Sequence, residues 1–146
     1  MPNTYTAKNS HVVAWDLYTI QINENHKIIT LEIKDLYVNL SIQNILKITV
    51  FCLNKNNQNH ASIDNILHLL EIILRQNYFQ YNNQFYQPNN GISIGSPTSS
   101  MLAEMYLQYF EKIHLKYYLE TRDIIYYKRY VDDLLIIFDQ TITNEY

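Results

Sequence analysis

The sequence has few of the residues on which several protein classes depend. Among its 146 residues there is one cysteine, Cys52, so neither an internal disulfide nor a zinc site built from several cysteines can form. No apolar run approaches the roughly 20 residues that span a bilayer, and no basic-then-apolar signal segment opens the chain. These absences predict an intracellular protein, in the nucleus or the cytoplasm, that is not secreted and needs no membrane.

Charge and glycine are also scarce. Charged residues make up 17% of the chain and the net charge is -3, so the basic footprint of a complete nucleic-acid enzyme is missing. Apolar residues reach 47%, which is typical of a globular domain with a core. The chain has 2 glycines, Gly91 and Gly95, and they lie close together. This placement indicates a loop whose backbone needs the conformational freedom of glycine.

Apolar periodicity predicts a mixed order of strands and helices. We expect an α+β fold in which helices pack on one face of an antiparallel sheet, within a single domain over residues 1–146. The stretch 54–60 is expected to be a loop. The first expected elements are a strand over 27–34, a helix over 41–53 capped by Ser41, and a helix capped by Ser62. Two short aromatic strands within 78–87 follow, joined at Asn82-Asn83. A long helix is then expected, capped by Ser96 with Pro97 as its first residue and ending near Glu120, before strands over 124–130 and 134–138.

The segment 124–138 (IIYYKRYVDDLLIIF) places two adjacent carboxylates, Asp132 and Asp133, in a tight turn between two apolar strands. An ordinary polar hairpin turn is one interpretation, because aspartate favours turns. The other is a metal site, because neighbouring acids repel each other and a bound cation offsets that repulsion.

Two further segments each allow a purely structural interpretation and a functional one. Gly91–Ser100 (GISIGSPTSS) is either a glycine loop with a helix cap or a backbone cradle for a phosphate or a base pair. Leu31–Ser41 (LEIKDLYVNLS) is a strand end that carries Glu32, followed five residues later by Tyr37, which packing alone would also explain.

Together, in this order, the three segments resemble the palm domain of reverse transcriptases. Tyr130-Val131-Asp132-Asp133 matches the Tyr-x-Asp-Asp motif, and Leu31–Ser41 is similar to the first catalytic motif, an acid followed by an aromatic residue. Gly91–Ser99, with the Ala103–Tyr106 and Glu111 positions after it, is similar to the motif that positions template and nucleotide. The resemblance is closest to Penelope-like retroelements, with non-LTR and group II intron enzymes next.

The resemblance implies an RNA-directed DNA polymerase that adds deoxynucleoside triphosphates to a DNA primer on an RNA template. Two Mg²⁺ ions, replaceable by Mn²⁺, would promote the phosphoryl transfer. It implies that Glu32, Asp132 and Asp133 are the catalytic and metal-binding acids. The substrate-binding positions it implies are Tyr37 under the sugar, Gly91, Gly95, Ser96 and Pro97 against nucleotide and template, and Tyr130 in the hairpin.

The sequence departs from the family pattern in two respects. Glu32 stands where the family has aspartate, and Asp35 cannot replace it without breaking the acid-to-aromatic spacing. We also expect residues 1–146 to contain no thumb and little of the fingers, and therefore to bind template and primer weakly and to extend no primer by themselves. Two alternatives stay open: a non-catalytic nucleic-acid-binding relic that keeps the palm fold, and an α+β domain with an accidental Asp-Asp turn.

Overall fold

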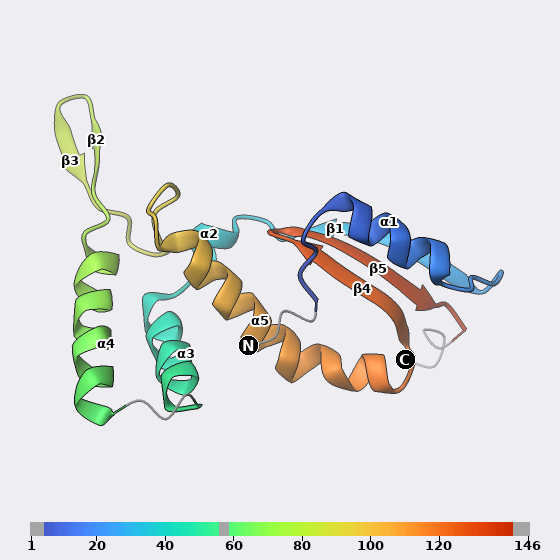
Figure 1. Ribbon diagram of the computed structural model, residues 1–146. Helices are drawn as coiled ribbons and strands as arrows, with labels where there is room; N and C mark the ends of the chain where they lie inside the picture. The colour runs from blue at the N-terminus through green and yellow to red at the C-terminus, as the bar shows by residue number, and fades with distance from the viewer. Residues whose placement is uncertain (1–4, 56–58, 142–146) are drawn as a thin grey trace. The chain divides into compact units, whose positions relative to one another are not determined.

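A computed structural model describes residues 5–55 and 59–141. The chain divides into two compact units, one formed by residues 1–34 and 108–146 and the other by residues 35–107. Within the described ranges, no helix combines the length and the apolar character that crossing a membrane requires. The expected α+β class, with an antiparallel sheet, is confirmed, and Figure 1 shows its strands and helices in chain order.

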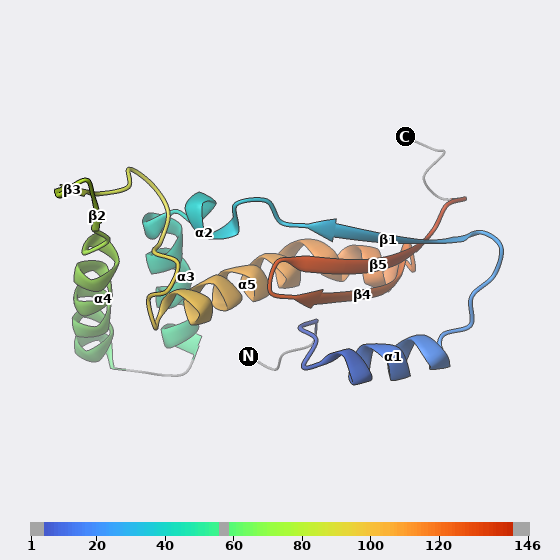
Figure 2. The same ribbon diagram turned by 90° about the horizontal axis from the view of Figure 1, so that it is seen from above.

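A three-stranded antiparallel sheet forms the centre of the first unit. Its strands are β1 (His26–Glu32), β5 (Asp133–Asp139) and β4 (Ile124–Tyr130), in the spatial order β1-β5-β4. Figure 2 shows the three strands side by side. The prediction of a hairpin is confirmed, and β4 has the expected bounds. Strand β1 ends at Glu32, two residues before the predicted end, because the backbone of Asp35 turns into the left-handed region at φ 53°.

Two helical segments contact this sheet within the first unit. The end of α5 (Ser99–Glu120), from Gln108 onward, contacts β4 through Glu111, whose carboxylate binds Tyr127 and Arg129. Helix α1 (Ser10–Thr19) contacts β4 through Asp16, which accepts a hydrogen bond from Tyr126 at 3.1 Å. Successive strand residues alternate between faces, so α1 and α5 bind opposite faces of β4. The expectation that helices pack on one face of the sheet is therefore wrong, because α1 adds a contact on the second face.

Helix α1 has no counterpart among the elements predicted from the sequence. No residue of α1 is fully buried, and its apolar residues do not gather on one side, so the usual periodicity is absent. Its start is defined locally instead, because the Asn9 side chain accepts a hydrogen bond from the Val12 backbone N–H at 3.0 Å.

The second unit contains α2 (Leu36–Asn39), α3 (Ile42–Lys55), α4 (His60–Arg75) and the hairpin of β2 (Phe79–Tyr81) and β3 (Gln84–Tyr86). Helices α3 and α4 contact each other, and each buries a few residues, among them Ile45 of α3 and Ile63 of α4. The aromatic hairpin turns at Asn82 and Asn83 as expected, with φ of 49° and 59°.

Three predicted boundaries in this unit are wrong. Asn59, not Ser62, caps α4, since its side chain accepts a hydrogen bond from the Ala61 N–H at 3.2 Å. The expected loop at 54–60 is shorter, because α3 runs to Lys55 and α4 begins at His60; residues 56–58 lie outside the described residues. Helix α5 begins at Ser99, so Ser96 and Pro97 belong to a turn before it, closed by the Ser99 N–H bonding the Ser96 carbonyl at 3.1 Å.

Candidate functional site

The hairpin between β4 and β5 brings two of the predicted acids to neighbouring positions of the sheet. Glu32 is the last residue of β1, and it lies directly opposite Asp133, the first residue of β5. Tyr130, the last residue of β4, lies opposite Asp133 on the other side. Residues opposite each other in an antiparallel pair share a face, so Glu32, Asp133 and Tyr130 form one row across the sheet.

Asp132 belongs to the turn rather than to this row. Its carbonyl accepts a hydrogen bond from the Ile33 N–H at 2.8 Å, which ties the turn to the residue that follows Glu32. Asp35 lies beyond the end of β1 and has no partner position in the strand ladder. The register therefore pairs the hairpin with Glu32 and not with Asp35.

The side chains of Glu32 and Asp133 are exposed, and Asp132 is half-buried. Carboxylate oxygens are the ligands that Mg²⁺ prefers, and this ion commonly binds through one or two carboxylates plus substrate phosphates and water. The Glu32–Asp133 pair fits that donor set. Across the described ranges there is no group of three or more His, Cys, Asp or Glu residues that could hold a metal ion by itself.

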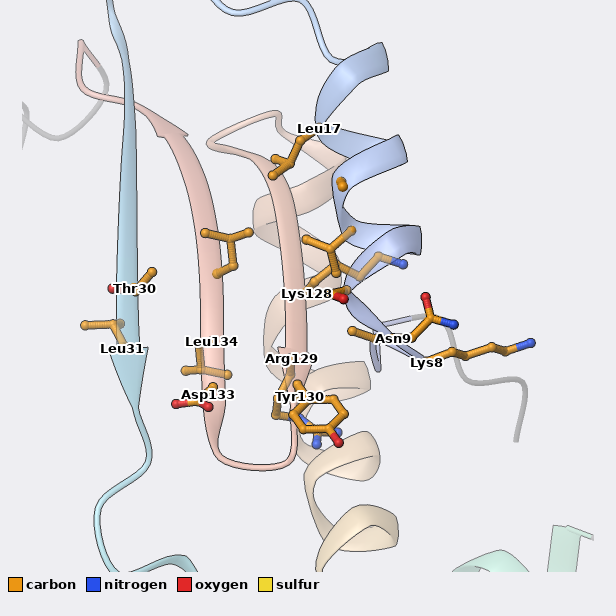
Figure 3. A pocket seen from close by; sticks show the side chains of 15 residues that line it. Lys8, Asn9, Leu17, Thr30, Leu31, Lys128, Arg129, Tyr130, Asp133 and Leu134 are labelled. Atoms are coloured by element: carbon orange, nitrogen blue, oxygen red, sulfur yellow. The ribbon is translucent and has the colours of Figure 1, made fainter.

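A cavity of about 810 Å³ lies between α1 and the sheet, next to this row of residues. Figure 3 shows Tyr130 and Asp133 at the turn end of the cavity and Leu17 of α1 near its other end. Most of the wall is apolar and includes Val13, Leu17 and Leu135. Of the candidate acids, Asp133 thus borders a partly apolar hollow rather than a flat surface.

A buried ionic network lies under the opposite face of the hairpin. Arg129 is 1% exposed and Glu111 is 2% exposed, and the Arg129 Nε donates to a Glu111 carboxylate oxygen. Tyr127 donates its hydroxyl proton to the same oxygen at 2.9 Å. Sequence reasoning included Glu111 in a motif but gave it no role, and it did not single out Arg129. A charged residue inside an apolar strand was the available signal, since such residues are rarely buried unless paired.

Burial and the negative charge of Glu111 raise the pKa of Tyr127 above its usual value of about 10. A group whose pKa is higher in the folded state stabilises the fold below the unfolded pKa, and this contribution is lost as the pH rises above that value. We therefore expect the free energy of unfolding to fall above pH 10, with Tyr127 accounting for about 1.4 kcal/mol by pH 11.

Denaturant unfolding between pH 8 and 11 measures this contribution. Tyr127→Phe should start from a lower stability but decline less steeply over this range than the unchanged chain. Tyr18→Phe, a change in an exposed side chain of α1, is the matched control for the loss of one tyrosine. Equal alkaline slopes in all three chains would contradict the expected role of Tyr127.

The glycine loop and the predicted sugar-binding tyrosine come together in the second unit. The Ile92 N–H donates to the Tyr37 carbonyl at 2.9 Å. Gly91 has φ 85°, and a Cβ added there would lie 2.7 Å from the Val38 backbone and 2.8 Å from the Tyr37 carbonyl oxygen. Only glycine allows this close approach. Two segments that the sequence analysis singled out separately are therefore one local structure.

Gly95 and its neighbours form an open turn before α5. Gly95 has φ 96° but no atom within 4 Å of an added Cβ, so here the backbone conformation alone requires glycine. The Ser96 Oγ lies 3.2 Å from the Thr98 Oγ1, and Pro97 is exposed. The loop leaves backbone and side-chain polar groups at the surface of the unit, close to the start of a long helix.

No protein-family model matches the sequence, and no curated protein matches it. Solved structures do share its fold. Telomerase from Candida tropicalis, in complex with a TWJ fragment of telomeric RNA, matches with a TM-score of 0.78 and 14% identity over 99% of this chain and 27% of that chain. Apo telomerase from Candida tropicalis, truncated from its C-terminal domain, matches with a TM-score of 0.70 and 14% identity over 96% of this chain and 30% of that chain.

Telomerase from Candida albicans, also with a TWJ fragment of telomeric RNA, matches with a TM-score of 0.68 and 15% identity over 96% of this chain and 28% of that chain. The chain thus spans less than a third of the length of these telomerases. It shares its fold with part of these telomerases, which is compatible with the expected partial palm-like fold.

Proposed function

We propose that this chain is the palm region of an RNA-directed DNA polymerase of the retroelement type. One observation carries the proposal: the strand register sets Glu32 opposite Asp133, beside the turn that contains Asp132. These residues are the ones that the motif resemblance assigns to catalysis, and they meet within a fold shared with telomerase. The assignment to Penelope-like retroelements rests on the sequence motifs alone.

The proposed reaction is an in-line phosphoryl transfer. The 3′-oxygen of the primer forms a bond to the α-phosphorus of a deoxynucleoside triphosphate, and the bond to pyrophosphate breaks. Glu32, Asp132 and Asp133 would hold the Mg²⁺ ions, which supply charge neutralisation and activation of the 3′-hydroxyl when bound. Mn²⁺ would replace Mg²⁺, since both ions accept carboxylate ligands.

The remaining residues would bind and orient the substrates. The loop around Gly91 and Gly95, with Ser96 and Pro97, would lie against the incoming nucleotide and the template, and Tyr37 would lie under the sugar. An RNA template is supported by the telomerase structures with telomeric RNA fragments that share this fold. The DNA primer and the deoxynucleoside triphosphates follow from the proposed reaction.

A second candidate is a nucleic-acid-binding remnant that keeps the palm fold without catalysis. Glu32 in place of aspartate favours it, because the extra methylene displaces the carboxylate by about an ångström and catalytic geometry tolerates little displacement. The two candidates differ in metal binding. The polymerase requires a divalent ion at the hairpin, and the remnant does not.

Titration of the chain with Mn²⁺, followed by NMR, tests the proposal. Paramagnetic Mn²⁺ should selectively broaden the amide signals of Ile33, Asp132 and Asp133, and Asp133→Asn should weaken this binding at least about 10-fold because a charged ligand is lost. The matched control is Asp139→Asn, which changes an acid on the same strand, an even number of residues away and so on the same face. It should leave the broadening unchanged.

The remnant predicts a different result. Broadening spread over all exposed carboxylates, or equal titrations for Asp133→Asn and the unchanged chain, would argue against the polymerase and favour binding without catalysis.

A further inference from the structure

We propose that the buried Glu111–Arg129 pair is a positioning device that holds the Val131–Asp132 turn and thereby sets the acids of the hairpin. This inference rests on the proposed function, because it explains how the candidate metal ligands are kept in place. Neither residue belongs to the exposed row of Glu32, Asp133 and Tyr130, so both would act from beneath the sheet.

Arg129 connects the turn to two other segments of the first unit. Its Nη1 donates to the Val131 carbonyl at 3.0 Å, and its Nη2 donates to Glu111 and to the Thr6 hydroxyl, each at 3.3 Å. Its backbone N–H donates to the Tyr5 carbonyl at 3.0 Å, and its carbonyl accepts from the Ala7 N–H at 2.7 Å. Figure 3 shows Arg129 at the end of β4, beside the turn, with α5 behind the sheet.

The turn needs such support because its first residue is strained. Val131 has φ 56°, a left-handed conformation that a β-branched residue rarely adopts. Strain of this kind persists only where the surrounding structure enforces it. The guanidinium of Arg129 does so by binding the carbonyl of the strained residue itself.

The support extends from the turn to the first strand. Asp132 follows Val131, and its carbonyl accepts the hydrogen bond of the Ile33 N–H. This bond is adjacent to the Glu32–Asp133 pair in the ladder. A turn released from Arg129 would therefore loosen the end of β1 and the spacing between the two acids.

Stability alone does not explain a buried ion pair. Taking both charges out of water is costly, and apolar residues of similar volume often stabilise a fold equally well or better. Arginine is also the cation suited to this geometry, because its planar guanidinium presents N–H donors in a fixed fork that binds a carboxylate and a carbonyl together, whereas the ammonium of lysine is a compact point charge without such fixed directions. The pair thus has the features expected of a geometric role.

Amide hydrogen exchange of the full chain tests the proposal without any metal. The reporter is the Ile33 amide, and the internal reference is the Gln140 amide, which bonds the Asn25 carbonyl at 3.0 Å beyond the other end of the β1–β5 ladder. The variants are Arg129→Lys and the double change Glu111→Leu with Arg129→Met, which removes both buried charges together so that the unit still folds. The control is Lys128→Met, which breaks the neighbouring ion pair with Asp16.

In both test variants we expect Ile33 to exchange at least about 10-fold faster relative to Gln140, and Mn²⁺ to bind at the hairpin at least about 10-fold more weakly. Lys128→Met should change neither property. Melting temperatures, measured in parallel, should stay within a few degrees for the double variant.

If the pair served stability alone, its loss would accelerate amide exchange at Ile33 and Gln140 equally, and that result would overturn the positioning role. Unchanged exchange at Ile33 in Arg129→Lys would overturn it as well. Failure of the unchanged chain to bind Mn²⁺ at the hairpin would instead overturn the proposed function. The exchange of Ile33 would then still decide whether the pair holds the turn.

Discussion

Glu32→Asp is expected to raise primer extension by about 10²-fold or more when residues 1–146 are joined to the fingers and thumb of a reverse transcriptase. The physical reason is geometric, since removing one methylene draws the carboxylate back by about an ångström, to the reach of the aspartate that the family pattern has at this position, and displacements of that size cost about 10²-fold in rate. The measurement is the rate of single-nucleotide incorporation on an RNA template.

Two further variants of the same polymerase control this experiment. Asp133→Asn, combined with Glu32→Asp, should abolish the gain because one metal ion loses a charged ligand. Asp35→Asn should have little effect, since Asp35 lies outside the strand ladder. If Asp35→Asn abolished incorporation while Glu32→Asp changed nothing, Asp35 would be the ligand of the first strand.

Gly91→Ala should have the largest effect on the second unit, a loss of about 2–5 kcal/mol of stability. An added Cβ would lie 2.7 Å from the Val38 backbone, which cannot yield like a flexible side chain, and the φ of 85° is strained for any residue with a Cβ. Denaturant unfolding, followed by circular dichroism, measures the change.

Gly95→Ala is the matched control, because it shares the positive φ but meets no atom within 4 Å. It should cost only about 1–2 kcal/mol, the price of the left-handed backbone. Equal losses in the two variants would show that backbone conformation, and not the contact with the Tyr37–Val38 segment, accounts for the effect at Gly91.

Local sequence patterns predicted much of the fold correctly. Apolar stretches on both sides of Asp132-Asp133 predicted the hairpin, and Asn82-Asn83 predicted the aromatic turn because asparagine tolerates a left-handed backbone. The predicted starts of helices were less accurate where more than one nearby residue could cap the helix. Ser62 and Ser96 are of a residue type that favours the start of a helix, but Asn59 caps α4 and the turn at Ser96 precedes α5.

Apolar residues at helical spacing are not all covered by a neighbour. In α4, Ile66 and Ile73 recur at helical spacing, yet they are 41% and 39% exposed, and in α5 Phe110 is 50% exposed. Periodicity identifies the face that is apolar, but it does not say how much of that face a neighbour covers. Helix α1 shows the reverse case, because a helix with no buried residue has no stripe to detect.

By itself the sequence determined the residue types and spacings of the candidate site: an acid five residues before an aromatic residue, a two-glycine loop and an Asp-Asp turn. Each depends on neighbours along the chain, where spacing translates directly into geometry. Only the tertiary structure decided that Asp133 lies opposite Glu32, that Gly91 contacts the Tyr37–Val38 backbone, and that Arg129 binds Glu111 beneath a strained turn. The residues of these pairs lie 18 to 101 positions apart in the sequence. They meet because of strand register and packing, which no local pattern encodes.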